Sequence, residues 1–182
     1  MPNDERLRVL LGRANDGDDT AFAELVRATQ FVVFRTCAAL GSSDSAEDLV
    51  QETFLKVWKT RATYRGESGV QTWIVGIARH TCIDHVRRSM RQRRLLGRIA
   101  ASVASSSSFV GVSAPDWLPP EYRDLLSATS PENAEAFMLT QFIGLSYDEA
   151  AEVIGCPTGT VRSRVSRARS SMLSAYRASE TG

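Results

Sequence analysis

Residues 144–169 read GLSYDEAAEVIGCPTGTVRSRVSRAR and contain two helix signals with a break between them. Ser146 can cap the first helix, and Glu149, three residues later, can complete a capping box. Gly155 is expected to end that helix, since Pro157 restricts the residue before it and lacks a backbone donor. Two helices joined by a short turn are the helix-turn-helix plan.

The second helix of this pair carries two contrasting faces, and Thr158 or Thr160 can cap it. Its apolar stripe, at spacings of one helical face, consists of Val161, Val165, Ala168 and Met172. The opposite face carries Arg162, Ser163, Ser166, Arg167 and Ser170, flanked by Arg164 and Arg169. Short hydroxyl side chains let a helix approach base edges, arginine binds guanine in a bidentate manner, and flanking arginines hold phosphates. The pattern favours a DNA-recognition helix over a solvated basic face on an ordinary core helix.

The charges of the chain are segregated although the formal net charge is only +1. Residues 116–152 hold eight acidic side chains and one basic one, whereas residues 79–98 hold seven arginines and one acid. Residues 155–177 hold five arginines and no acid. Separate surfaces of opposite charge indicate separate partners.

Almost every segment has helical periodicity, which predicts an all-α fold. Helices are expected over residues 20–40, residues 45–60 and from residue 71 into the arginine-rich stretch, with a polar loop at 61–70. A serine-rich change of composition follows, and prolines then precede a second helical unit. The sequence predicts a helical domain at 1–95, a flexible linker at 96–115 and a second helical domain at 116–182.

The helix expected at 45–60 has a core side and a polar side. Its core side consists of Ala46, Val50, Thr53, Phe54 and Val57. Its polar side consists of Asp48, Gln51, Glu52, Leu55 and Lys59. An acidic face that contains a leucine suits a protein partner, but a solvated charged face explains the pattern equally well.

The chain shows few signs of a metal site, of a disulfide framework or of a membrane segment. His80, Cys82, Asp84 and His85 lie so close on one predicted helix that they point in different directions, and no metal ligand set is expected. Three widely spaced cysteines fit ordinary thiols in a reducing cytoplasm. No apolar run is long enough to span a bilayer, and the first residues lack a secretory pattern. Trp58 and Trp73, at helical spacing, are expected in the core.

The motif at 144–169 resembles region four of the extracytoplasmic-function sigma factors of RNA polymerase. The string Asp44–Trp58 resembles the segment of that family that docks on the beta-prime clamp helices, and Tyr64–Arg88 resembles the region that reads and opens the minus-ten element. The resemblance implies two helical sigma domains on a flexible tether. Its implied partners are core RNA polymerase, through the beta-prime clamp helices and the beta flap, promoter DNA and, in addition, an anti-sigma factor.

The resemblance also implies roles for individual residues, with no cofactor and no catalytic residue. The core polymerase would contact Asp48, Gln51, Glu52 and Leu55. The minus-ten element would meet Tyr64, Arg65, Arg79, His80, Arg87 and Arg88. The minus-thirty-five element would meet Gly159, Arg162, Ser163, Arg164, Ser166, Arg167 and Arg169.

Two other functions fit the sequence less well than a sigma factor. A helix-turn-helix regulator that acts without joining the polymerase needs a sensor or receiver domain, and residues 1–95 lack alternating strands and helices. An enzyme acting on nucleic acid needs convergent carboxylates, a nucleophile with its base or a phosphate-binding glycine loop, and none of these patterns is present. The sequence therefore favours a sigma factor, in which the partner polymerase performs the chemistry.

Overall fold

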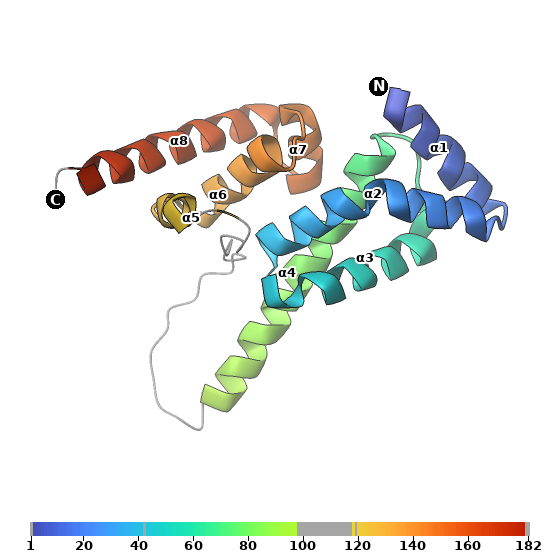
Figure 1. Ribbon diagram of the computed structural model, residues 1–182, viewed down its shortest axis with the longest axis horizontal. Helices are drawn as coiled ribbons and strands as arrows, with labels where there is room; N and C mark the ends of the chain where they lie inside the picture. The colour runs from blue at the N-terminus through green and yellow to red at the C-terminus, as the bar shows by residue number, and fades with distance from the viewer. Residues whose placement is uncertain (1, 42, 98–117, 119, 181–182) are drawn as a thin grey trace.

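The computed structural model describes residues 2–41, 43–97, 118 and 120–180, and within these ranges it leaves out the side chains of residues 2–3, 43, 93–97, 121 and 180. The described residues form helices and turns, with no strand among them (Figure 1). The predicted all-α fold is therefore confirmed. The linker expected at 96–115 falls, apart from its first two residues, outside the described part of the chain.

The amino-terminal half consists of four helices, α1 (Pro2–Asn15), α2 (Asp19–Leu40), α3 (Ala46–Thr60) and α4 (Val70–Gly97). The last three correspond to the helices expected from the sequence. The side chain of Asp18 caps α2 by accepting a hydrogen bond from the amide of Ala21 at 3.0 Å. Carboxylate acceptors of this kind satisfy the amides that a helix start leaves without partners.

The helix α1 was not predicted, although its apolar residues have clear helical spacing. Leu7, Leu10, Leu11 and Ala14 lie at i, i+3, i+4 and i+7 and are all buried. They pack with α2 and α4 around a core that includes Leu25 and Ile74.

The carboxy-terminal half contains α5 (Pro120–Ser127), α6 (Pro131–Phe137), α7 (Tyr147–Ile154) and α8 (Thr158–Glu180). A π-helical segment, Met138–Phe142, continues α6 toward α7. Helix α8 packs against α5, α6 and α7 through its apolar stripe. The long α8 therefore has one covered side and one side open to solvent (Figure 1).

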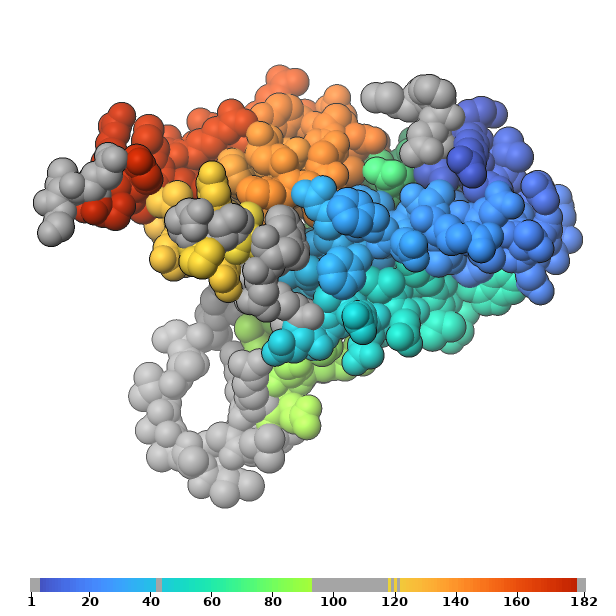
Figure 2. Space-filling model, in the orientation of Figure 1, coloured from blue at the N-terminus to red at the C-terminus, as the bar shows by residue number. Residues whose placement is uncertain are grey.

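The two halves of the chain lie against each other (Figure 2), and helices α4 and α7 are in contact between them. Arg79 of α4 forms an ion pair with Glu135 of α6, with 2.7 Å between Nε and Oε1. Thr72 of α4 donates a hydrogen bond to Glu149 of α7 at 3.1 Å. Both contacts join residues of the predicted minus-ten domain to residues of the predicted helix-turn-helix domain, and this arrangement with the two halves in contact is the closed form.

Candidate nucleic-acid interface

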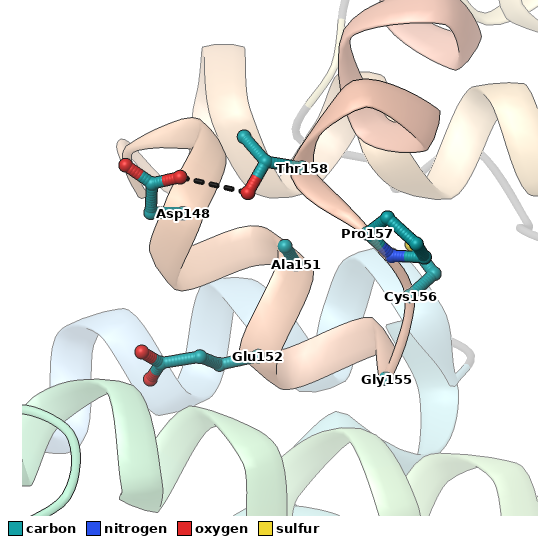
Figure 3. A pocket seen from close by; sticks show the side chains of 7 residues that line it. All are labelled: Asp148, Ala151, Glu152, Gly155, Cys156, Pro157 and Thr158. Carbon is teal, nitrogen blue, oxygen red and sulfur yellow. Dashed lines mark hydrogen bonds between the residues drawn. The ribbon is translucent and has the colours of Figure 1, made fainter.

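The turn between α7 and α8 is built as the sequence predicts. Ser146 and Glu149 form the capping box, and Gly155 ends α7 in the left-handed conformation with φ of 78°. One expectation needs correction, because α8 begins at Thr158 and both possible capping threonines lie inside it. The Thr158 hydroxyl instead donates to Oδ1 of Asp148 at 2.8 Å (Figure 3).

The hydrogen bond between Thr158 and Asp148 joins the first residue of α8 to the first turn of α7. With Pro157 it fixes the angle between the two helices, because proline holds its own φ and restricts the residue before it.

The turn also lines a shallow, open hollow bounded by Ala151, Glu152 and Cys156 (Figure 3). The carboxylates of this hollow make it a poor place for DNA phosphates, so contact with DNA is expected along α8 itself.

The two faces of α8 agree with the sequence. Val161, Val165 and Ala168 are buried, and Met172 is half-buried against the same core. On the opposite side the exposed residues are Gly159, Arg162, Ser166, Arg167 and Ser170, and Arg169 at the flank is exposed as well. Exposed arginines and serines on one side of a helix that follows a tight turn can enter a major groove.

Three residues of the recognition surface have partners within the protein, and a fourth is half-buried. The guanidinium of Arg162 lies 6.0 Å from the centre of the Tyr147 ring. Arg169 donates to Oε1 of Gln141 at 2.8 Å, which ties it to the π-helical segment. Ser163 donates to the carbonyl of Thr160 and is half-buried, as is Arg164.

The polar face of α3 lies on the surface of the protein. Asp48, Gln51, Leu55 and Lys59 are exposed, and the exposed fraction of Leu55 is 60%. Glu52 is half-buried and pairs with Lys56 at 3.0 Å and with Arg88 at 3.2 Å. Burial works to raise the pKa of the Glu52 carboxyl, but the donors from Lys56 and Arg88 outweigh it and hold the pKa below its ordinary value.

The predicted core residues on the opposite side of α3 are buried, with one difference. Ala46, Thr53, Phe54 and Val57 are buried, whereas Val50 is only half-buried. Leu49, which the sequence prediction left out, is buried instead. The buried side is therefore turned slightly from the predicted one and leaves the polar face of α3 unchanged.

The loop between α3 and α4 starts with a 3-10 turn at Arg61–Thr63 and continues to Gly69. Tyr64 is half-buried, its ring centre lies 5.3 Å from that of Trp73, and its hydroxyl donates to the carbonyl of Ser68 at 2.5 Å. Burial raises the pKa of this hydroxyl, which keeps it protonated as a donor. Arg65 is by contrast strongly exposed, with 81% of its side chain accessible.

The two tryptophans expected in the core are half-buried at its edge. Trp58 makes an edge contact with Phe22 at 4.8 Å between ring centres, and the guanidinium of Arg61 covers its ring at 3.6 Å. Trp73 packs against the core beside Tyr64. Both rings are engaged within the protein, which fits a packing role.

The predicted minus-ten residues of α4 differ in accessibility. Arg79 has only 12% of its side chain exposed because of its pair with Glu135, which is 2% exposed. His80 is exposed and its Nδ1 lies 2.8 Å from the carbonyl of Gly76. Arg87 and Arg88 are exposed, and Arg88 is the residue that pairs with Glu52.

Glu149 serves the capping box and the contact between the two halves at once. Burial works to raise the pKa of its carboxyl, but donors from Ser146 and Thr72 hold the pKa below its ordinary value. The carboxylate is therefore ionised at neutral pH, where it supports both the start of α7 and the contact with α4.

Two residues of α1, Asp4 and Arg8, lie at the candidate minus-ten loop and were not predicted. Oδ1 of Asp4 accepts from the amide of Val70 at 2.7 Å, and Arg8 donates to the carbonyl of Ser68 at 3.0 Å. The spacing of the leucines between and after them could have revealed α1 and hence this contact.

The described residues offer neither a metal site nor a membrane-spanning helix. The described part of the chain contains no group of three or more His, Cys, Asp or Glu side chains that could hold a metal ion. Cys37 and Cys82 are buried free thiols, and Cys156 is a half-buried one. None of the described helices has both the length and the hydrophobicity needed to cross a membrane.

Comparison with known families gives two matches that cover both halves of the chain. Residues 23–92 match the model of sigma-70 region 2, and residues 121–172 match that of sigma-70 region 4. The chain is 35% identical over 171 residues to the ECF RNA polymerase sigma factor SigC of Mycobacterium tuberculosis, covering 94% of this chain and 91% of the relative. It is 33% identical to the ECF RNA polymerase sigma-E factor of Escherichia coli strain K12, covering 89% and 90%.

Solved structures show the same architecture. The structure of CnrH in complex with the cytosolic domain of CnrY aligns with a TM-score of 0.70 at 23% identity, covering 95% of this chain and 98% of that one. The sigma factor RpoE of Bartonella quintana, solved with the anti-sigma factor NepR, aligns with a TM-score of 0.60 at 26% identity, covering 85% and 95%. With both regions matched and the helices in place, the chain belongs to the extracytoplasmic-function sigma factors of the sigma-70 family.

Proposed function

We propose that this sigma factor binds core RNA polymerase in the cytoplasm, directs it to promoters and promotes opening of the DNA, while the polymerase performs all the chemistry. The observation that carries the proposal is α8, whose buried stripe leaves Arg162, Ser166 and Arg167 together on an open face after a tight turn. The family supports the rest, because it is made up of polymerase subunits that lend promoter specificity.

Three surfaces divide the work in this proposal. The exposed face of α3, with Asp48, Gln51, Glu52 and Leu55, binds the beta-prime clamp helices. The Tyr64–Gly69 loop and α4 meet the minus-ten element through Tyr64, Arg65, Arg79, His80, Arg87 and Arg88. The α8 surface meets the minus-thirty-five element through Gly159, Arg162, Ser163, Arg164, Ser166, Arg167 and Arg169.

The proposed domains are residues 1–95 and 116–182, joined by a linker at 96–115, and the second of them faces the beta flap. An anti-sigma factor is a further partner, which the structure of a similar sigma factor bound to an anti-sigma factor supports. Contact of Arg79 with the minus-ten element requires the two domains to separate, because Arg79 lies in the contact between them.

Two measurements test the proposal as a whole. The free chain should co-migrate with core RNA polymerase on size exclusion in the absence of DNA. The resulting holoenzyme should then give run-off transcripts from a subset of a promoter library. A chain that binds promoter DNA but does not co-migrate with the polymerase would instead be an independent regulator.

A charge reversal at Asp48 tests the α3 surface. Asp48→Arg should weaken binding to core polymerase about tenfold or more, because it places a cation on a face where the proposal needs an acid. Asp48 is exposed, so the free energy of unfolding should change by less than about 0.5 kcal/mol. Affinity is measured by titrating labelled core enzyme, and stability by thermal melting.

Asp16→Arg is the matched control for Asp48→Arg. It makes the same charge change at an exposed position in the turn between α1 and α2, and it should leave the affinity for core polymerase unchanged. If the two variants bind the polymerase equally well, the α3 face is a solvated surface and the assignment of Asp48 is wrong.

A further inference from the structure

The loop that precedes α4 is held in place by side chains from α1. The carbonyl of Ser68 accepts two hydrogen bonds, one from Arg8 at 3.0 Å and one from the Tyr64 hydroxyl at 2.5 Å. The guanidinium of Arg8 also lies 5.7 Å from the centre of the Tyr64 ring. Arg8 therefore contacts both ends of the loop at once.

Asp4 fixes the point where the loop becomes a helix. Its Oδ1 accepts from the amide of Val70, the first residue of α4, at 2.7 Å, and its Oδ2 accepts from Nε of Arg8 at 2.8 Å. Gly69 stands immediately before α4 and has no side chain with which to cap the helix. Asp4 supplies that acceptor from another helix, and its negative charge suits the positive end of the α4 dipole.

Two glycines in the loop allow α1 to come this close. A Cβ added at Gly69 would lie 3.0 Å from Oδ1 of Asp4, and one added at Gly66 would lie 3.1 Å from Nη1 of Arg8. Gly66 also has φ of 74°, a conformation that other residues rarely adopt. The two glycines, Asp4 and Arg8 thus act together to hold the loop. Helix α1 takes part although it lies outside the segment that matches sigma-70 region 2.

We infer that Asp4 and Arg8 are positioning residues for minus-ten recognition, which hold the Tyr64–Gly69 loop in the conformation that presents Arg65 to the promoter strand. This inference rests on the proposed role of the loop in reading that element. A loop that is ordered before it meets DNA loses less conformational freedom on binding. It therefore keeps the contacts that favour one base over another. A loop released from α1 would bind several sequences about equally.

The test measures base preference, because a merely structural role for Asp4 would lower stability without changing that preference. Holoenzyme is incubated with a single-stranded DNA library randomised over a short segment, and the bound fraction is sequenced. With wild-type protein a preferred segment should be enriched. With Asp4→Ala or Arg8→Ala the enrichment of that segment should fall about tenfold, while binding to core polymerase stays intact.

Two further variants separate the effect on the loop from a general loss of folding. Asp4→Asn keeps an acceptor for the Val70 amide and should retain part of the preference. Glu5→Ala changes an exposed residue of the same helix and should behave as wild type.

Gly69→Ala approaches the same contact from the other side. Its new Cβ would lie 3.0 Å from Oδ1 of Asp4, so the carboxylate must shift by a few tenths of an ångström and the variant should lose part of the base preference that Asp4→Ala loses. In the Asp4→Ala background the obstruction is gone, and adding Gly69→Ala should have little further effect. Additive losses in the double variant, or wild-type preference in Asp4→Ala, would overturn the inference.

The outcomes distinguish this inference from the proposed function beneath it. If wild-type holoenzyme enriches no segment, the minus-ten role of the loop fails. If wild type enriches a segment and Asp4→Ala enriches the same one to the same extent, the loop reads DNA without help from α1.

Discussion

Arg79→Ala should open the free protein. The substitution leaves the Glu135 carboxylate, 2% exposed, without its partner at the contact between the two halves. An uncompensated buried charge costs about 3–5 kcal/mol. If the two halves separate, water can reach Glu135 while each half stays folded. Opening is therefore the least costly response to the loss of Arg79. The radius of gyration from small-angle X-ray scattering should therefore rise.

Glu135→Ala should open the protein as well, since it leaves Arg79 nearly buried and unpaired. Its effect on DNA binding should differ from that of Arg79→Ala, because it frees an arginine of the proposed minus-ten surface instead of removing it. The free chain should bind single-stranded DNA more tightly with Glu135→Ala, and no more tightly with Arg79→Ala despite its opening. Filter binding at several salt concentrations would measure the difference.

Two controls accompany these variants. Glu132→Ala removes another acid of α6 and should keep the wild-type radius of gyration. The double variant Arg79→Ala with Glu135→Ala removes both charges and should be more closed than either single variant. Wild-type dimensions in both single variants would mean that the contacts between α4 and α7 hold the closed form without the Arg79–Glu135 pair.

Arg162→Ala and Arg167→Ala should reduce discrimination at the minus-thirty-five element. Both side chains are exposed on the open face of α8, where a bidentate contact with a base is worth about 1–3 kcal/mol. Arg164→Ala and Arg169→Ala should weaken all promoters alike, because these residues flank that face and Arg169 is tied to Gln141. Holoenzyme binding to promoters that differ at single upstream positions measures both effects.

The control for the α8 variants is Arg177→Ala, which lies farther along the same helix and is exposed. It should leave both affinity and discrimination close to wild type. A uniform loss across all promoter sequences in Arg162→Ala and Arg167→Ala would show that these arginines contact phosphates, and the base-facing positions would have to be reassigned.

The sequence was sufficient to predict those features that depend on residues within one helix or at its ends. The capping box at Ser146, the stop at Gly155 and the buried stripe from Val161 to Ala168 depend on residues close together in the chain, and all three are confirmed. The prediction that Thr158 or Thr160 caps α8 was wrong. The Thr158 hydroxyl donates to Asp148 of α7 instead, and a contact between two helices leaves no pattern in the local sequence.

Contacts between distant residues could not be predicted. The pair of Arg79 with Glu135 joins positions 56 residues apart, and each residue alone looks like a solvated charge. The hydrogen bond from Val70 to Asp4 spans 66 residues and needs α1, which was not predicted although its leucines are regularly spaced. Both contacts follow from how helices pack, and packing is decided by the whole set of apolar faces.

The burial of α1 determines where sigma factors of this kind can be cut and recombined. A chimaera that joins at residue 23, where the region 2 match begins, would cut α2 near its start and exchange the rest of α2, α3 and α4 without the helix α1 that packs on them. Each of Leu7, Leu10 and Leu11 contributes about 1.5–3 kcal/mol through its burial, so the hybrid would depend on a foreign α1 fitting the same groove. A junction placed before Asp4 transfers the helix together with the surface it supports.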